Sequence, residues 1–351
     1  MPEKVVYILG AGFSAPLDIP VMSNFLEKSK DMFAKNPELY SYFDDVFSTI
    51  DKFSKVQTYY KADFHNIEEI LSILEMKTNL NNPELGIRFE EYIVDVIKYH
   101  TPDIVDIPKA WGDDLSAIFG GKNPYRDYGV FISCLLNIEF RFYDTGTTPD
   151  TVLKSDVQTT YSVVTLNYDL VFENFSKLIK KHTHTDSIKK NFLGFSSDDT
   201  DNFLLAYAKL HGSIDSRGII LPTWNKGIRS DQIKSIWSLA HKAISEANYI
   251  RIIGYSLPIN DTYVKYLLKS AVVGSKNLKK IDVICLDDYE NAVSKRYEDF
   301  ISRKLLRLNP SDALNYLRKV LAENSKLTDD QKGKRVTLDK LEEVHEQFMN
   351  E

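Results

Sequence analysis

Short apolar runs recur along the chain at long intervals, and most of them end at a small or polar residue. The runs are rich in β-branched residues and do not alternate with polar positions, which is typical of strands buried on both faces of a parallel sheet. We therefore predict strands at residues 5–9, 162–166, 203–210, 218–221, 249–253 and 281–286.

The segments between these runs carry apolar residues at helical spacing. They predict helices at residues 169–181, 230–248 and 261–273. Strands that alternate with helices indicate an α/β fold with a doubly wound, mostly parallel, Rossmann-like sheet.

Two regions interrupt the alternation. Residues from about 23 to 154 lack strong strand signals, and we interpret them as a helical insertion or subdomain. Within it, apolar residues at positions i, i+3, i+4 and i+7 from Ile67 predict a helix, with Asn66 as its N-cap and Glu69 completing a capping box.

Beyond Tyr289 the chain becomes polar, and we predict a helical C-terminal extension over residues 291–351 after a catalytic domain over residues 1–290. The last helix has a narrow apolar stripe, which serves either to pack the helix on its own domain or to contact a partner. The sequence favours packing on its own domain. The stripe consists of Leu338, Leu341, Val344 and Phe348.

The composition narrows the function classes. The 351 residues carry a net charge of −6, which gives no general attraction to nucleic acid or an anionic membrane. The only cysteines, Cys134 and Cys285, exclude a four-cysteine zinc module and a disulfide framework and favour a reducing compartment. Since no apolar run approaches the roughly 20 residues of a membrane span, we expect a cytoplasmic protein.

A glycine turn follows the first predicted strand. Gly10-Ala11-Gly12-Phe13-Ser14 has the strand-to-turn context of a dinucleotide-binding loop, in which glycines let the backbone approach a pyrophosphate. A tight turn without a ligand explains the same residues equally well. The acidic residue that normally follows on a second strand about 20 residues later is absent, which argues against an ordinary Rossmann dehydrogenase.

Polar residues follow two further strands, at the sheet edge where open α/β sheets bind ligands. Thr165, Asn167 and Asp169 come at the end of one, and His211 followed by Gly212 at the end of another. Asp169 is explained as well by capping a helix. Asn167 suits the orientation of a water or a ribose hydroxyl, and His211 is a candidate general base, although a lone histidine is more often structural.

The last two strands add weaker candidates. Gly254 and Ser256 follow one strand and have the size to approach a ligand, while Asn260 or Asp261 fits the N-cap of the next helix. Asp287 follows the other strand, where it suits either the ribose hydroxyls of adenosine or an ordinary turn.

In this order the motifs resemble the sirtuins, over about residues 4–290 without the helical insertion. The pattern is Gly-Ala-Gly-x-Ser followed by Ile19-Pro20, then Thr-x-Asn-x-Asp, His-Gly and Gly-x-Ser at strand ends. Three departures separate the chain from sirtuin deacetylases. Asp18 replaces their glycine, Val21-Met22-Ser23 replaces their Asp-Phe-Arg, and the cysteine pairs for their structural zinc are missing.

The segments at residues 66–71 and 221–226 resemble a bacterial sirtuin-like branch found in anti-phage defence systems. That resemblance implies an enzyme that cleaves NAD as its substrate without zinc. It also implies homo-oligomers and a defence partner such as a HerA-type ATPase or an Argonaute protein. It implies no direct binding to nucleic acid or membrane.

The resemblance also implies roles for the site residues. Asn167 positions a water or the ribose, and His211 polarises a ribose hydroxyl or the water. Asp169 holds either the geometry of the site or the hydrogen-bond network on the nicotinamide side. The pyrophosphate is cradled by Gly10, Ala11, Gly12 and Ser14. Two other functions stay open, an NAD-dependent protein deacylase and a non-catalytic module that senses NAD or ADP-ribose.

Overall fold

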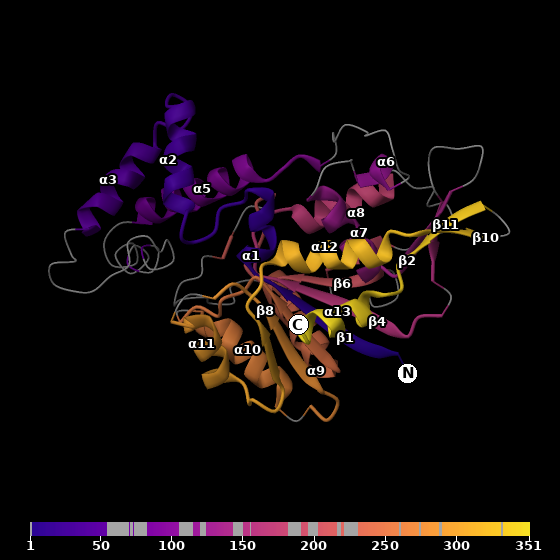
Figure 1. Cartoon of the computed structure of the whole chain (residues 1–351). Helices are drawn as coiled ribbons and strands as arrows, with labels where there is room; N and C mark the ends of the chain where they lie inside the picture. Colours follow the sequence, from indigo (N-terminus) through magenta and orange to yellow (C-terminus); the bar gives the residue numbers. More distant parts are fainter. Residues whose placement is uncertain are drawn as a thin grey trace.

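Figure 1 shows the chain as a computed structural model, in which a twisted sheet carries helices on both faces and a helical lobe at one end. The structure describes residues 2–54, 70, 73, 83–104, 115–119, 124–142, 150–154, 156–181, 191–195, 203–215, 219–220, 231–259, 261–273, 275–287, 290–330 and 333–351. Among these residues, no helix is long and apolar enough to cross a membrane.

The main sheet has seven strands in the order β5-β6-β4-β1-β7-β8-β9, and all of its pairs are parallel. From β1 the chain extends the sheet first toward β5 and later toward β9. The predicted doubly wound sheet is therefore confirmed, with its switch point at β1. The strands are β1 (Glu3–Leu9), β4 (Thr159–Thr165), β5 (Asn191–Gly194), β6 (Phe203–Lys209), β7 (Tyr249–Ile253), β8 (Lys280–Ile284) and β9 (Leu306–Asn309).

Helices cover both faces of the main sheet (Figure 1). One face carries α7 (Tyr125–Leu135), α8 (Val171–Lys181), α12 (Ala313–Asn324) and α13 (Leu341–Met349). The other face carries α9 (Asp231–Glu246), α10 (Thr262–Val272) and α11 (Ala292–Phe300). The predicted helices at residues 169–181, 230–248 and 261–273 correspond to α8, α9 and α10.

The burial of β1 explains why its sequence is continuously apolar. Val5, Tyr7 and Leu9 enter the core under α7 and α12, whereas Val6 and Ile8 enter the core under α9 and α10. Since successive side chains of a strand point to opposite faces, a strand covered on both sides needs an apolar residue at every position.

The helical insertion forms a lobe beyond the end of the sheet (Figure 1). After α1 (Ala11–Ser14) and a 3-10 turn, η1 (Ala15–Leu17), its helices are α2 (Phe25–Lys35), α3 (Phe43–Ser54) and α5 (Pro83–His100). The lobe has its own aromatic core, which also contacts Tyr168 and Ile214 beside the sheet. The helix predicted near Asn66 falls outside the described residues except for Ile70 and Ile73, which are both helical.

A second, antiparallel sheet corrects two expectations. Its order is β10-β11-β2-β3, with β2 (Ile138–Phe142) and β3 (Asp150–Leu153) inside the region that we interpreted as helical. A short helix, α6 (Ser116–Phe119), precedes it. β10 (Leu327–Asp330) and β11 (Gly333–Thr337) lie in the C-terminal extension, which also supplies β9 to the main sheet. These strands are short and carry charged residues, so a search for continuous apolar runs misses them.

The strand predicted at residues 218–221 is also wrong for the part that the structure describes. Ile219 and Ile220 belong to no strand, and Gly218 and Leu221 lie outside the described residues. The amide of Ile220 instead donates a hydrogen bond to the carbonyl oxygen of His211, at 2.8 Å. This loop therefore folds back over the end of β6.

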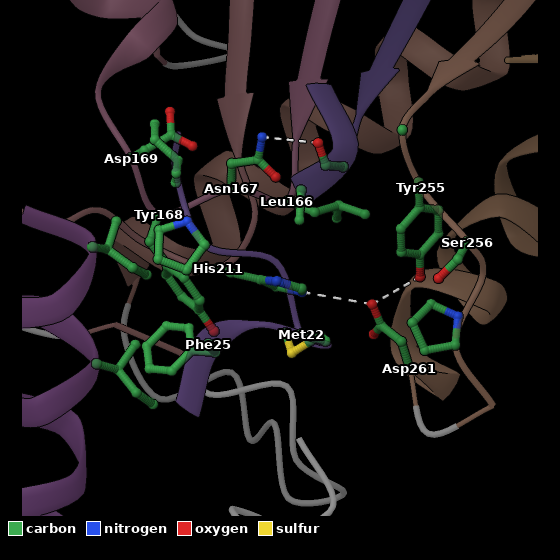
Figure 2. A pocket seen from close by; sticks show the side chains of 18 residues that line it. Met22, Phe25, Leu166, Asn167, Tyr168, Asp169, His211, Tyr255, Ser256 and Asp261 are labelled. Atoms are coloured by element: carbon green, nitrogen blue, oxygen red, sulfur yellow. Dashed lines mark hydrogen bonds and ion pairs between the residues drawn. The ribbon is translucent and has the colours of Figure 1, made fainter. Parts of the chain in front are cut away.

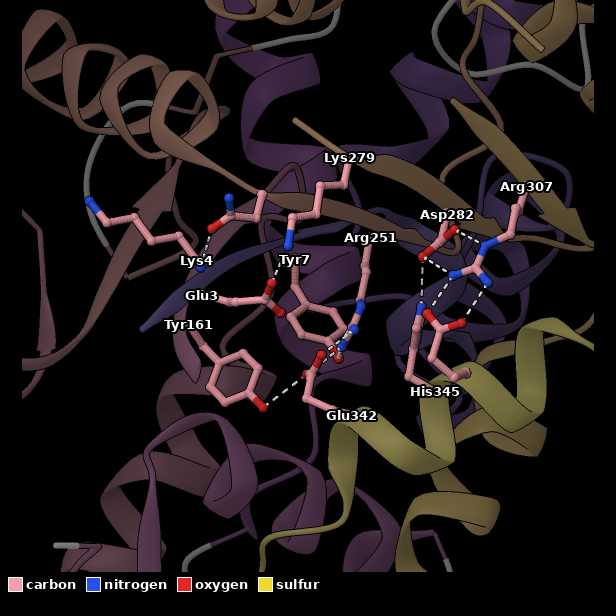
Figure 3. A network of polar contacts seen from close by, with 12 residues as sticks. Glu3, Lys4, Tyr7, Tyr161, Arg251, Lys279, Asp282, Arg307, Glu342 and His345 are labelled. Carbon is pink, nitrogen blue, oxygen red and sulfur yellow. Dashed lines mark hydrogen bonds and ion pairs between the residues drawn. The ribbon is translucent and has the colours of Figure 1, made fainter. Parts of the chain in front are cut away.

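A row of polar side chains crosses the main sheet beneath α13 (Figure 3). Tyr7, Arg251, Asp282 and Arg307 are register partners on β1, β7, β8 and β9. Arg251 donates hydrogen bonds of 2.8 and 2.6 Å to the two carboxylate oxygens of Glu342 on α13. The C-terminal helix is therefore fixed to the sheet by charge as well as by its apolar stripe, whose side chains are all buried. This confirms that the stripe packs on its own domain.

His345 of α13 completes the row. Burial and the nearby Arg251 lower the pKa of His345 to about 4, so its ring is neutral at pH 7. Nε2 then donates to Asp282 at 2.9 Å, and Nδ1 accepts from the Tyr316 hydroxyl at 3.1 Å. Asp282 also accepts hydrogen bonds of 2.6 and 2.9 Å from Arg307. Both ring nitrogens and both carboxylate oxygens thus have partners.

Candidate active site

The glycine turn after β1 packs against the turn after β7. The amide of Gly10 donates to the carbonyl oxygen of Ile253 at 3.0 Å, and the amide of Gly12 donates to that of Gly254 at 2.8 Å. A Cβ atom at Gly10 or Gly12 would lie 2.6 or 2.8 Å from the nearest atoms of the β7 turn. Close approach of two backbones therefore explains both glycines, and Gly10 with Ala11 forms one wall of the pocket beside them.

Asn167 ties the end of β4 to this glycine turn (Figure 2). Its side-chain amide donates to the carbonyl oxygen of Gly10 at 3.0 Å and to Oγ of Ser14 at 3.1 Å, while its backbone amide donates to Oγ1 of Thr165 at 3.1 Å. The carbonyl oxygen of Gly10 can only accept a hydrogen bond, so the side-chain nitrogen of Asn167, and not its oxygen, must face it. Its amide oxygen is turned away from the glycine turn.

His211, at the end of β6, is buried in the same pocket. Its Nε2 atom lies 3.9 Å from Oδ2 of Asp261, and its ring lies 6.0 Å from the ring of Tyr168. The Tyr255 hydroxyl donates a 2.8 Å hydrogen bond to the same oxygen of Asp261 (Figure 2). A histidine that follows β6 and a carboxylate and a tyrosine that follow β7 thus meet around one cavity.

Asp169 performs the capping role that the sequence left open. Its carboxylate accepts from the amide of Val171 at 3.0 Å, and its carbonyl oxygen accepts from the buried Lys209 ammonium. Lys209 also pairs with Glu173 at 2.8 Å. Burial raises the pKa of Glu173, although Lys209 opposes the shift. Asp169 is therefore held firmly, and it also lines the pocket.

The pocket lies at the carboxyl ends of β1, β4, β6 and β7, and its cavity volume is about 110 Å³. One part of the wall is polar or backbone, and it includes seven of the residues proposed from sequence, namely Gly10, Ala11, Asn167, Asp169, His211, Gly254 and Ser256.

Four of the proposed residues do not line the pocket. Ser14 and Thr165 lie behind Asn167 and hold it, and Gly12 packs on Gly254. Asp287 accepts from the amides of Val293 and Ser294, at 2.8 and 2.9 Å, and thereby caps α11. These hydrogen bonds fit the prediction that Asp287 has an ordinary role in a turn. The alternative, that it contacts the ribose of adenosine, stays a prediction.

Sequence reasoning missed the opposite wall. Met22 and Phe25 come from the start of the helical lobe, and Ile93 and Ile97 from α5, so the insertion closes the apolar side of the pocket. It also missed Asp261, which we assigned to the N-cap of α10. Asp261 occupies that position, but its side chain makes no capping hydrogen bond and faces the pocket instead.

Asp18 replaces a glycine of the resembled motif, and its backbone explains the exchange. It has a φ of 68°, in the left-handed region that aspartate tolerates better than most residues. Its carbonyl oxygen accepts from the Lys28 ammonium at 2.6 Å. Aspartate at position 18 can therefore adopt the left-handed conformation that a glycine would also allow at this turn into the lobe.

Among the described residues, no group of three or more His, Cys, Asp or Glu side chains is arranged to hold a metal ion. Cys134 and Cys285 are both free thiols. Burial raises the pKa of each to about 12, so both stay protonated at neutral pH.

No protein-family model matches the chain, and no curated protein matches it either. Solved structures similar to it include Sir2 proteins. A Sir2 complex with the inhibitor EX-527, 2'-O-acetyl-ADP-ribose and deacetylated p53 peptide is 13% identical, covers 92% of this chain and 94% of that one, and has a TM-score of 0.37. Sir2Tm bound to a propionylated peptide is 12% identical, with coverages of 92% and 93% and a TM-score of 0.40. A complex of Sir2, p53 peptide and NAD⁺ is also 12% identical, with coverages of 92% and 93% and a TM-score of 0.36.

Proposed function

We propose that the chain is a sirtuin-like NAD glycohydrolase, which cleaves the nicotinamide–ribose bond of NAD to give ADP-ribose and nicotinamide. One observation carries the proposal. Asn167, His211 and the Gly10–Ala11 turn come from three strand ends and meet in one buried pocket at the switch point of the sheet.

The chemistry fits these groups. Loss of nicotinamide leaves an oxocarbenium-like centre at the anomeric carbon of the ribose, as in glycoside cleavage. The electron pair of the broken C–N bond neutralises the nicotinamide ring, and a water oxygen bonds to the anomeric carbon. The proton of that water goes to His211 as general base.

The other pocket residues orient the reactants or keep bulk water away from the reacting bond. The amide oxygen of Asn167, directed away from the glycine turn, is the group to orient the water or a ribose hydroxyl. The apolar wall of Met22, Phe25, Ile93 and Ile97 excludes bulk water from the reacting bond. Gly254 and Ser256 line the same pocket as Asp169, and in this proposal they contact the dinucleotide.

Sequence resemblance supports the wider role. We propose that the enzyme depletes NAD in anti-phage defence, in the cytoplasm, as a homo-oligomer and beside a partner such as a HerA-type ATPase or an Argonaute protein. The domain boundary near residue 290 belongs to the same proposal.

Nicotinamide release tests the activity. The purified chain, alone and with the product of its neighbouring gene, is incubated with NAD, and nicotinamide and ADP-ribose are separated by chromatography. We expect both products in equal amounts, and a loss of at least about 100-fold in Asn167→Ala and His211→Ala. Full activity in both variants would contradict the site.

Two other outcomes identify the alternative functions. Formation of O-acyl-ADP-ribose from an acyl-lysine peptide would make the chain a deacylase. Tight NAD binding without nicotinamide release, both alone and with the partner, would make it a sensing module.

A further inference from the structure

His211 faces a second buried acid that the chemistry above does not use. Nε2 of His211 and Oδ2 of Asp261 are 3.9 Å apart, and the two residues are 4% and 2% exposed. The distance is longer than a hydrogen bond but within the range of an ion pair. Between groups this buried, screening by water is weak, so the charge of Asp261 acts strongly on the imidazole.

Asp261 is held in this direction by its neighbours. The Tyr255 hydroxyl donates to Oδ2 at 2.8 Å, and the Tyr297 hydroxyl fixes Tyr255 by donating to its carbonyl oxygen at 2.7 Å. The hydrogen bond from Tyr255 favours the ionised form of Asp261. No helix-capping bond competes for the carboxylate.

Two residues shortly before Asp261 have a backbone conformation in the left-handed region. Gly254 has a φ of 65°, and Leu257, a residue with a side chain, has a φ of 51°. Such conformations are unfavourable for a residue other than glycine and persist where the surrounding structure enforces them. Leu257 is fully buried, so packing holds this turn in place ahead of Asp261.

We propose that Asp261 is the positioning residue of His211: it orients the imidazole and stabilises the imidazolium that forms when water attacks, while Tyr255 holds its carboxylate in place. This inference rests on the proposed NAD hydrolysis. In the step concerned, the bond from water oxygen to the anomeric carbon forms, the C–N bond breaks, and the water proton moves to His211. The new positive charge lies beside the negative charge of Asp261.

Other ionisable groups also act on this centre. From β4 and the loop after it, Tyr168 and Asp169 line the pocket beside His211. From α10, Lys265 interacts electrostatically with Asp261, and from α11, Arg296 donates to the carbonyl oxygen of Ser256. These groups are unchanged in an Asp261→Asn variant, so a difference between that variant and the wild type reports on the Asp261 charge alone.

Kinetics against pH provide the first test. In Asp261→Asn we expect kcat to fall by about 10–100-fold, with KM changed by less than about threefold, because the base is weakened while NAD contacts remain. Loss of the negative charge lowers the pKa of His211. The acidic limb of the kcat profile should therefore move down by about 1 pH unit.

Companion variants separate this role from a structural one. Asp261→Glu should restore part of kcat, and Tyr255→Phe should shift the profile in the same direction by a smaller amount. The controls are Asp299→Asn and Tyr266→Phe, which change exposed residues on α11 and α10 and should match the wild type. Thermal unfolding of each variant shows whether a lost activity is only a lost fold.

Titration without NAD provides the second test and does not depend on activity. The imidazole of His211 is followed by NMR and assigned by the signal that His211→Gln removes. We expect its pKa to be higher by about 1 unit in the wild type than in Asp261→Asn. Equal values, or an unshifted kinetic profile with unchanged kcat, would overturn the role of Asp261. If the wild type releases no nicotinamide but the titration shows the difference, the pairing stands and the proposed hydrolysis fails.

Discussion

Two buried His–Asp pairs lie in the part of the chain that the structure describes, and their surroundings differ. His345 and Asp282, beneath α13, are 2.9 Å apart, and the remaining polar atoms of both side chains bond to Tyr316 and Arg307. His211 and Asp261 are 3.9 Å apart and both line an open pocket. The first pair belongs to the polar row beneath α13, while the second lines the pocket at the ends of the strands.

The comparison shows that residue type and burial alone do not identify a catalytic pair. Asp282 illustrates the structural case. Burial raises its pKa, but hydrogen bonds from His345 and Arg307 lower it to about 2, so its charge is already neutralised by protein groups. The Asp261 carboxylate accepts a hydrogen bond from Tyr255 and lies beside His211 at the pocket.

The largest expected effect is on stability, from Arg251→Met in the row beneath α13. Removal of the guanidinium leaves Glu342 and Tyr7 without their buried cationic partner, which should lower the free energy of unfolding by about 3–5 kcal/mol. Urea unfolding measures the loss. Arg303→Met, in an exposed pair with Glu298, is the matched control and should change stability little. A loss below about 1 kcal/mol would contradict the structural role of the row.

The second expected effect is a pH dependence carried by His345. Its pKa is about 4 in the folded chain and near 6.5 when unfolded, so the unfolded chain binds the proton first as the pH falls. Stability from this group is complete above about pH 6.5, falls toward pH 4 and then levels off, for a total on the order of 3 kcal/mol.

Unfolding of the wild type and His345→Gln between pH 4 and 8 measures this difference. The variant should lack the part of the slope between about pH 6.5 and 4. An identical slope in both proteins would show that His345 is not held neutral.

The third effect returns to the pocket, with Gly254→Ala. A Cβ atom there would lie 2.3 Å from the backbone nitrogen of Phe13, and the φ of 65° disfavours any side chain. We expect a loss of about 2 kcal/mol in stability and weaker NAD binding, because the glycine turn must move. Calorimetry with NAD and urea unfolding test both, and a variant with wild-type values in both would mean that the turns are not tightly packed.

The smallest effect is expected near the start of β1, where Lys4 pairs with Glu246 at 2.6 Å and both side chains are about half exposed. Lys4→Gln should change stability by less than about 0.5 kcal/mol, because solvent screens the pair. A larger change in urea unfolding would indicate that the polar row extends to the surface.

The parts of the fold found from sequence have a strong local signal. β1 and β7 are apolar at nearly every position because helices cover both faces, and Asn167 and His211 stand out because each follows such a strand. β9 was missed because Leu306-Arg307-Leu308-Asn309 alternates and is short. Asp261 occupies the predicted N-cap position, but its place in the pocket was missed, because a carboxylate at a helix start has the same sequence pattern whether it caps the helix or faces a pocket.

The sequence by itself determined the parallel α/β fold, the glycine turn and the two polar strand ends, since each depends on residues within one local segment. Tertiary structure alone decided which charged groups meet. Arg251 and Asp282 sit within apolar strands, and only the register across β7, β8 and β9 together with the docking of α13 makes them partners. In the same way, only the bent path from Gly254 places Asp261 opposite His211, 50 residues away in the chain.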